Sequence, residues 1–572
     1  GRHARLCDAP GDGWRLTVYR AGFTTPAWFR TGVMYQIFPD RFARDSSATA
    51  QRGMEHHRRM GQTVHCHAGW DEPVEWQANT PEGEYAPVDF YGGTLRGIAD
   101  RLHYLQKLGV TVLYLNPIFE SASNHRYDTG DYRKVDPILG TNADFKKLCA
   151  AAADCGIRIV LDGVFAHTGA DSRYFNRFRH YPGCGAYNSH SSVYARWYSF
   201  AHYPDDYKCW WDFKDLPAVN ATNPDWRKYM ITGERSIVKT WLRDGASGWR
   251  LDVADELPDD VLRGMRSAAK ETDPDSVLLG EVWEDAVTKV SYGERRQYAL
   301  GDALDSVMNY PLRDGLVTFL TGRSTARALA DLLLSQRLNY PRPLYYALMN
   351  LTASHDVART RSALALDFDP RSRTRAELAA LEITDAMAAR GAQLQVLAAA
   401  VQFWLPGIPS IYYGDETGMQ GLCDPFNRAP LQMCDTQMLQ WYAQLTALRH
   451  AHPALTRGEV AVFAPAGDVL CVLRVIADGR DAFGEEAEDE ALLLIVNRAA
   501  HPVRCHVELT CPGAGLCEET RLAFVRSEYD CAADCTDDTH IAIHDGVGAF
   551  DLPPHAAKIY RLENRHGTET GS

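Results

Sequence analysis

Residues 248–252 read GWRLD and residues 276–281 read SVLLGE, and each is a short run of strand-forming residues that ends in an acid. Similar runs recur along the chain. The longer stretches between them, such as 95–109 and 142–156, carry apolar residues at helical spacing and end in Gly. Strands that alternate with helices predict a parallel sheet, and eight strands predict a closed (β/α)8 barrel of the α/β class. The expected strands are 33–38, 111–116, 157–162, 248–252, 276–281, 304–309, 345–350 and 409–414.

Some segments depart from this alternation of strands and helices. Residues 163–223, dense in Tyr, Trp, His and Gly, are too long for an ordinary loop and predict a small domain inserted after strand three. From residue 451, short alternating segments predict a C-terminal antiparallel β-sandwich, with the acidic stretch 478–490 as a solvated hairpin loop. Residues 14–30 look like a final strand and linker. The expected units are 1–29 (remnant of an N-terminal domain or linker), 30–162 and 224–450 (barrel), 163–223 (inserted domain), 451–563 (β-sandwich) and 564–572 (flexible tail).

The composition narrows the classes of partner. The 572 residues carry a formal net charge of -14, and 45% of them are hydrophobic. No apolar run approaches the roughly 18 residues that a membrane span needs. Nucleic-acid binding needs Lys and Arg clustered on one face. The sequence therefore argues against nucleic-acid and membrane partners and favours a neutral substrate.

The fourteen cysteines are too dilute for a disulfide scaffold, and none has zinc-site spacing. Five lie close together in the C-terminal region, where a disulfide stays open but the odd count leaves one unpaired: Cys505, Cys511, Cys517, Cys531 and Cys535. This usage favours a reducing, cytoplasmic compartment. The chain starts at Gly1 without Met, so we expect either a removed signal or an internal fragment, and secretion stays open as the alternative.

Four acids stand at or after strand ends, namely Asp162, Asp252, Glu281 and Asp356. In a parallel barrel the reactive residues come from the carboxyl ends of the strands, so these acids are expected to converge. Retaining cleavage of a glycosidic bond needs one carboxylate as nucleophile and one protonated carboxyl as acid. Arg250 projects to the same side as Asp252 and is expected to hold it ionised, whereas like-charged neighbours favour the protonated form of Glu281.

These segments resemble the signature segments of the α-amylase superfamily, glycoside hydrolase family 13. They are DGVFAHT (162–168), GWRLDVADE (248–256), LLGEVW (278–283) and LTASHDVART (351–360). The resemblance implies a TIM barrel in which Asp252 is the nucleophile, Glu281 the acid/base and Asp356 the transition-state stabiliser. It also implies that the reacting sugar is surrounded by His125, Tyr127, Asp162, His167, Arg250 and His355.

Finer details resemble the neopullulanase, cyclomaltodextrinase and maltogenic amylase subgroup. They are LPAVN (216–220), VADE (253–256), GIPSIYYGDETGMQG (407–421) and DPFNR (424–428), which adds Arg428 to the candidate substrate-binding residues. The resemblance implies no required cofactor. Ala166 stands where many relatives carry an Asn that binds a structural calcium, and Ala offers no side-chain oxygen, so that calcium site is in doubt. The upstream domain typical of neopullulanases is mostly missing, which leaves monomer and homodimer both open.

Each candidate also has a structural interpretation. The histidines could be satisfied core residues, Asp162 a helix cap, and Trp283 a packing residue rather than part of the cleft. Glu256, four residues after the nucleophile, could contact the leaving-group side or simply start a helix. Trp210 and Trp211 could stack on sugars or fill the core of the inserted domain. The expected activity is hydrolysis of α-1,4 links in maltooligosaccharides, cyclodextrins, pullulan or starch through a covalent intermediate. The alternatives are a transglycosylase of the same fold and a non-catalytic carbohydrate-binding relative.

Overall fold

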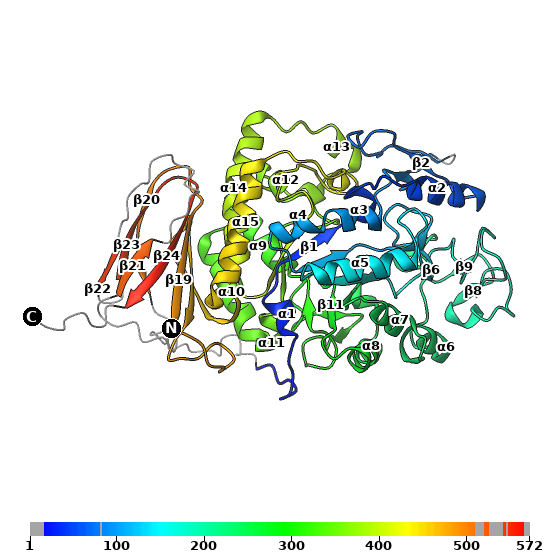
Figure 1. Ribbon diagram of the computed structural model, residues 1–572, viewed down its shortest axis with the longest axis horizontal. Coiled ribbons are helices and arrows are strands. Elements are labelled where there is room, and N and C mark those ends of the chain that lie inside the picture. Colours follow the sequence, from blue (N-terminus) through cyan, green and yellow to red (C-terminus); the bar gives the residue numbers. More distant parts are fainter. Residues whose placement is uncertain (1–15, 81–82, 510–519, 525–540, 545–546, 565–572) are drawn as a thin grey trace, which may run out of the picture.

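The computed structural model describes residues 16–80, 83–509, 520–524, 541–544 and 547–564. Eight parallel strands form the centre of the molecule, in the order β14-β11-β10-β7-β4-β1-β16-β15 (Figure 1). A bridge between Met308 and Met349 joins the two end strands and closes the barrel. The barrel strands are β1 (Met34–Ile37), β4 (Val112–Leu115), β7 (Arg158–Gly163), β10 (Gly248–Leu251), β11 (Val277–Gly280), β14 (Ser306–Val307), β15 (Met349–Leu351) and β16 (Ile408–Tyr412). All eight predicted strands are present, although the seventh is shorter and later than expected, because α11 occupies part of its range.

Helices follow the strands and cover the outside of the barrel. Thr141 begins α5 with a capping box to Asp144, and Gly156 ends it at a φ of 74°, as the sequence predicts. The covering helices are α3 (Leu95–Asp100), α4 (Leu102–Lys107), α5 (Asn142–Asp154), α6 (Pro224–Arg227), α7 (Ile237–Arg243), α8 (Asp259–Thr272), α9 (Tyr310–Leu320), α10 (Ala326–Asn339), α11 (Arg342–Tyr345), α12 (Thr360–Ala365), α13 (Arg375–Ala379), α14 (Asp385–Trp404), α15 (Thr436–Ala451) and α16 (Pro453–Arg457). None of the helices in the described part of the chain combines the length and the apolar character that crossing a membrane requires.

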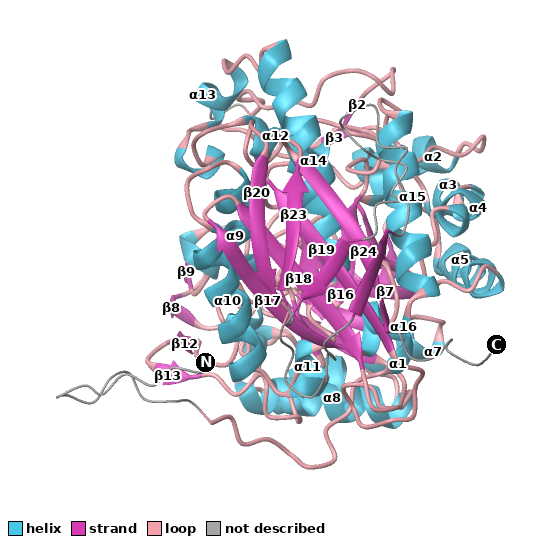
Figure 2. Cartoon of the chain, turned by 90° about the vertical axis from the view of Figure 1, so that its left-hand side faces the viewer, coloured by secondary structure: helices cyan, strands magenta, loops and turns pink. Residues whose placement is uncertain are grey.

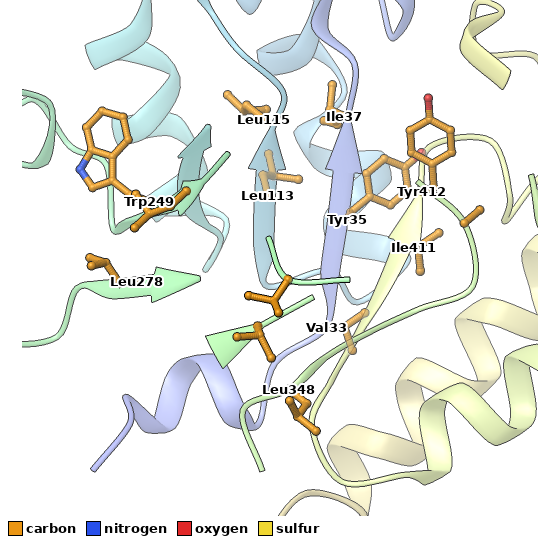
Figure 3. Packing of buried hydrophobic residues seen from close by; sticks show 14 of the residues in the cluster. Val33, Tyr35, Ile37, Leu113, Leu115, Trp249, Leu278, Leu348, Ile411 and Tyr412 are labelled. Carbon is orange, nitrogen blue, oxygen red and sulfur yellow. The ribbon is translucent and has the colours of Figure 1, made fainter. Parts of the chain in front are cut away.

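Side chains of the barrel strands alternate between two buried layers. Outward-facing residues such as Ile37, Leu113 and Trp249 pack in the layer between strands and helices (Figure 3). Met34 and Val112 face inward and pack with the interior positions of the other strands. Because successive side chains point to opposite faces of a strand, the residues at the inward positions near the carboxyl ends share one space.

The expected strand in 14–30 is wrong for its described part. Residues 16–26 form no strand, and 27–30 form the helix α1 (Ala27–Arg30). Leu16 and Val18, which give the segment its alternating pattern, are 88% and 76% exposed, and no described strand pairs with them. The segment instead follows the barrel surface, where Thr17 donates a hydrogen bond to the carbonyl of Asn339.

The long connections lie at the carboxyl ends of the strands. After β1 come η1 (Pro39–Arg41), α2 (Thr49–Arg59) and the paired β2 (His65–Cys66) and β3 (Asp89–Phe90), and after β4 the pair β5 (Phe119–Ser121) and β6 (Thr129–Val135). After β7 come η2 (Ala195–Trp197), the pair β8 (Phe200–His202) and β9 (Asp206–Tyr207), and η3 (Trp210–Asp212). The segment 216–220 then returns to the chain just after β7 through a bridge from His167 to Ala218, and a bridge from Tyr198 to Val219 joins two parts of the inserted segment.

The second large sheet follows the barrel and is antiparallel, in the order β17-β18-β19-β24-β21-β22-β23-β20 (Figure 2). The end strands β17 and β20 contact each other, so the sheet encloses a core of its own. This confirms the predicted fold class, a barrel with a C-terminal antiparallel sandwich. The strands are β17 (Glu459–Ala466), β18 (Val469–Ile476), β19 (Glu490–Asn497), β20 (Val503–Glu508), β21 (Thr520–Phe524), β22 (Ile541–His544), β23 (Val547–Leu552) and β24 (Ala556–Asn564).

The acidic loop 478–490 connects two antiparallel strands, as predicted, but it is not fully solvated. Asp481 and Ala482 are buried, and the ring of Phe483 packs edge-on against Tyr346 with centroids 5.1 Å apart. The guanidinium of Arg30 lies 4.2 Å from the centroid of the same ring. The sequence pattern of the loop is mainly acidic, so it did not predict this apolar contact.

Candidate active site

Arg250 lies at the centre of a cluster of acids inside the barrel. Its Nη1 contacts Asp162 Oδ1 and Asp252 Oδ1, each at 2.8 Å, and its Nη2 lies 3.0 Å from Glu281 Oε2. Arg250 faces inward on β10, Asp252 directly follows that strand, and Arg250 pairs in register with Asp162 on β7. Three of the predicted acids therefore meet at one fully buried guanidinium.

The candidate nucleophile Asp252 is almost entirely buried. Burial raises its pKa well above the usual range, and the nearby carboxyls of Glu281 and Asp162 raise it further, while Arg250 acts in the opposite direction. Arg250 donates to Asp252 Oδ1 and so orients the carboxyl and favours its ionised form.

Glu281 stands just beyond β11 and accepts hydrogen bonds on both oxygens. The backbone N–H of Val253 donates to Oε2 at 2.8 Å, and the indole N–H of Trp283 donates to Oε1 at 3.1 Å. Val253 has a φ of 38°, a left-handed conformation that is strained for a β-branched residue. The Trp283 ring stacks on Tyr310 at 3.9 Å and remains 37% exposed, so it borders the opening beside Glu281.

Asp356 approaches the cluster from the loop after β15. Its Oδ2 accepts from the hydroxyl of Tyr310 at 3.3 Å, and its Oδ1 lies 3.2 Å from His355 Nε2. Burial and the charge of Glu281 raise the pKa of Asp356 to about 7. The carboxyl is 26% exposed, which leaves it accessible to a ligand.

Tyr127 and His355 connect the acids to polar side chains deeper in the barrel. Their rings stack at 5.2 Å, and the Tyr127 hydroxyl donates to Asp162 Oδ2 at 2.8 Å and lies 2.5 Å from His355 Nε2. His355 Nδ1 accepts from Gln36 Nε2 at 2.9 Å, so Nε2 carries the proton. Burial lowers the pKa of His355 well below its usual value, so the ring is neutral at pH 7.

His125 and His167 lie on the same side, next to Tyr127. His125 Nδ1 accepts from the backbone N–H of Tyr127 at 3.0 Å, and His167 Nε2 donates to the Tyr127 carbonyl at 3.2 Å. Burial lowers the pKa of His125 to about 3 and that of His167 to about 4. Trp210 stacks on His167 at 5.7 Å and on Trp211 at 5.1 Å. Trp211 is 73% exposed, so this aromatic series runs from the site to the surface rather than filling a core.

The remaining two candidates differ in position. Arg428 is buried beside the cluster, where its Nε donates to the His355 carbonyl at 3.1 Å and its Nη1 pairs with Asp424 at 2.9 Å. Glu256 ends the short helix η5 (Ala254–Glu256) and has no hydrogen bond to the acids; both its oxygens face the hydroxyl of Tyr292.

Sequence reasoning missed four residues that hold the cluster in place. Asn116 receives a hydrogen bond from Gln36 and donates to the Tyr127 hydroxyl, Tyr114 donates to Asp162, and Tyr310 donates to Asp356. The signal for Gln36 was available. It is the single strongly polar residue of VMYQIF, two residues after the inward-facing Met34.

The comparisons with known proteins agree with this geometry. A model described as the catalytic domain of alpha amylase matches residues 36–429, which is more than half of the chain. The chain belongs to the α-amylase family. Thus the family resemblance seen in the sequence is confirmed.

Members of the α-amylase family with curated names are similar over most of this chain. An amylopullulanase from Thermoanaerobacterium saccharolyticum is 35% identical over 89% of the chain, and a cyclomaltodextrinase from Geobacillus thermopakistaniensis is 32% identical over 83% of it. The chain covers 41% of the former protein and 70% of the latter, so it spans less than half of that amylopullulanase.

A solved structure of the same family also covers nearly the whole chain. It is the cyclic α-maltosyl-(1→6)-maltose hydrolase from Arthrobacter globiformis, at 27% identity and a TM-score of 0.68, with 94% of this chain and 99% of the other covered.

Proposed function

We propose that this chain is a retaining α-glucan hydrolase that cleaves α-1,4-glucosidic bonds through a covalent glucosyl-enzyme on Asp252. The observation that carries the proposal is the contact of Asp252 and Glu281 with a single guanidinium. This arrangement favours the short carboxyl separation of retaining enzymes, about 5–5.5 Å, over the wider one of inverting enzymes.

In the first step, a carboxylate oxygen of Asp252 attacks the anomeric carbon while Glu281 gives its proton to the leaving glycosidic oxygen. In the second, Glu281 takes a proton from water, and the water oxygen displaces Asp252 from the sugar carbon. Asp356 stabilises the positively charged transition state between these positions. The ring of Tyr127 provides an apolar face for the reacting glucose, and the Nε2–H of His125 is available as a hydrogen-bond donor for a sugar hydroxyl. His167 and His355 use their N–H groups to hold Tyr127.

The names of the relatives support the substrate class. They point to maltooligosaccharides, cyclodextrins, pullulan and starch, and the exposed series from Trp210 to Trp211 would support a glucan chain that extends beyond the reacting sugar. A cytoplasmic location and the choice between monomer and homodimer stay predictions from the sequence. The nine described cysteines are free, which fits a reducing compartment, while Cys7, Cys511, Cys517, Cys531 and Cys535 lie outside the described residues.

We also propose that no metal ion is required. Ala166 has no side-chain oxygen, and its carbonyl already accepts from the N–H of Val219 at 3.0 Å. Among the described residues, no three His, Cys, Asp or Glu side chains gather as a metal site would need. The residues at this position therefore do not fit the calcium ion of typical α-amylases.

The test is product analysis with maltotetraose, β-cyclodextrin, pullulan and soluble starch. Asp252→Asn is expected to lower kcat more than about 10⁴-fold, because it removes the nucleophile. Asp260→Asn, an exposed acid on α8, serves as the control. An active Asp252→Asn enzyme contradicts the assignment. Binding without cleavage by the wild type supports the non-catalytic alternative, and an excess of longer products over new reducing ends supports the transglycosylase.

A further inference from the structure

A short hairpin follows Glu281 along the chain, made of β12 (Val290–Ser291) and β13 (Glu294–Arg295). Ser291 pairs with Glu294, so the turn consists of only Tyr292 and Gly293. Their φ angles are 53° and 80°, the left-handed pair of a type I′ turn. That turn favours Asn or Gly at its first position, and an aromatic residue there is strained. The strain indicates that the ring of Tyr292 has a use that the turn itself does not explain.

Tyr292 is 76% exposed, yet its hydroxyl is fixed. It lies 2.7 Å from Glu256 Oε1 and 2.6 Å from Glu256 Oε2, so it donates between the two carboxylate oxygens. This hydrogen bond raises the pKa of Tyr292 to about 12, which keeps the hydroxyl protonated as the donor. An exposed ring that is held at its hydroxyl loses little conformational freedom when a ligand stacks on it.

The position of the pair relative to the reaction follows from the roles of the acids. Glu281 protonates the leaving oxygen, so the departing part of the glucan lies on the side of Glu281 and Trp283. The hairpin of Tyr292 belongs to the same connection after β11, and Glu256 ends the short helix that begins two residues after Asp252. Trp283 and Tyr292 are thus two exposed aromatic rings on the connection that carries Glu281, and Glu256 ties Tyr292 to the helix that follows Asp252.

We propose that Tyr292, held by Glu256, is a binding position for glucose units of an α-glucan on the leaving-group side. A pyranose presents an apolar C–H face that stacks on an aromatic ring, and Tyr292 offers such a ring in solvent. The inference rests on the proposed hydrolase function. Glu256 acts here as a positioning residue for the ring.

The experiment compares two substrates that differ in the leaving group. Maltohexaose can place glucose units on both sides of the cleaved bond, whereas the leaving group of α-maltosyl fluoride is a single atom that cannot reach Tyr292. Tyr292→Asn removes the ring and supplies the residue that a type I′ turn favours, so the variant should fold. Tyr292→Phe keeps the ring. His555→Asn is the matched control, because His555 also has a left-handed φ, of 46°, but lies just before β24 in the C-terminal sheet.

For Tyr292→Asn, the ratio of kcat/KM for maltohexaose to that for maltosyl fluoride should fall about fivefold, the scale of one aromatic contact. It should change little in Tyr292→Phe and in the control. An unchanged ratio in Tyr292→Asn overturns the proposal, as does an equal loss on both substrates. If the wild type cleaves neither substrate, the proposed hydrolase function itself fails, which is a separate outcome.

Discussion

At the scale of single residues, the main feature of the site is that several acids gather around one buried arginine. Three carboxyls share the guanidinium of Arg250, and the charges of Glu281 and Arg250 also act on Asp356. Burial and the charges of neighbouring carboxyls raise the pKa values of Asp252 and Asp356, and Arg250 opposes this effect.

Arg428 allows a test of this view. Burial and Glu281 raise the pKa of Asp356 to about 7, and the positive charge of Arg428 limits this rise. Replacing it in Arg428→Gln should raise that pKa further. If the ionised form of Asp356 is required, kcat/KM for maltotriose should then begin to fall at a higher pH as the solution is acidified. Arg428→Lys keeps the charge and should shift the profile less, and an acid limb that stays in place or moves to lower pH contradicts the argument.

The residue-level predictions succeeded where the spacing along a strand decides which way a side chain points. Arg250 and Asp252 share a side because they are two residues apart at the end of β10, and Asp162 and Glu281 stand at the ends of the two strands that flank β10. Gln36 and Asn116 were missed because their roles depend on each other and on His355, more than 230 residues away. A sequence pattern reports spacing along one strand, not the pairing of side chains across a barrel.

At the scale of elements, the inserted segment after β7 returns to the barrel by main-chain contacts. His167, just after β7, bridges to Ala218, whereas the bridges from Tyr198 to Val219 and from Cys209 to Pro217 join parts of the inserted segment to each other. The segment 216–220 therefore acts as a strand-like clasp beside the site. Because the clasp uses backbone groups, it depends little on side-chain identity.

The clasp leads to a prediction about metal removal. Treatment with EDTA should leave both Tm and kcat for maltotetraose unchanged, because the carbonyl of Ala166 bonds to Val219 rather than to an ion. Calorimetry and activity with and without added Ca²⁺ measure this. A typical calcium-dependent α-amylase serves as the positive control for chelation. A fall in Tm that added Ca²⁺ reverses would show a metal site formed by other groups.

Element prediction failed where alternation along the chain was the single criterion. Residues 16–19 alternate like a strand, but the described chain offers no strand edge beside them. Conversely, β21, β22 and β23 were not predicted individually, although the region was assigned to the sandwich. Pairing partners decide whether an alternating segment becomes a strand, and those partners come from elsewhere in the fold.

At the scale of the whole molecule, barrel and C-terminal sheet share a hydrophobic core. Leu494 on β19 belongs to the same buried cluster as the barrel residues, whereas its neighbour Leu493 faces the interior of the sandwich. Arg474 on β18 donates to the carbonyl of Trp404 on α14 across the boundary, and to the carbonyls of Leu455 and Gly458 in the connection before β17. Both faces of these central strands are therefore buried.

This shared core predicts a single unfolding transition. Leu494→Ala should cost about 2–5 kcal/mol, as a large buried cavity does, and should lower the Tm of barrel and sheet together. Leu493→Ala should have a similar cost, and Arg504→Ala, at an exposed position of β20, should have little effect. Calorimetry measures the transitions. If Leu494→Ala produces a separate early transition of the sheet with the barrel unaffected, the two parts are independent.

The two-sided burial of β18 and β19 also limits how such a protein can be rearranged in evolution. A gene fusion or deletion with its junction near residue 450 would separate the barrel from the sheet and expose apolar side chains on α14 and on the sheet. We expect selection to remove such a junction. In larger homologous proteins, the barrel and its C-terminal sheet should therefore be inherited together. Recombination junctions should lie outside this pair rather than between the barrel and the sheet.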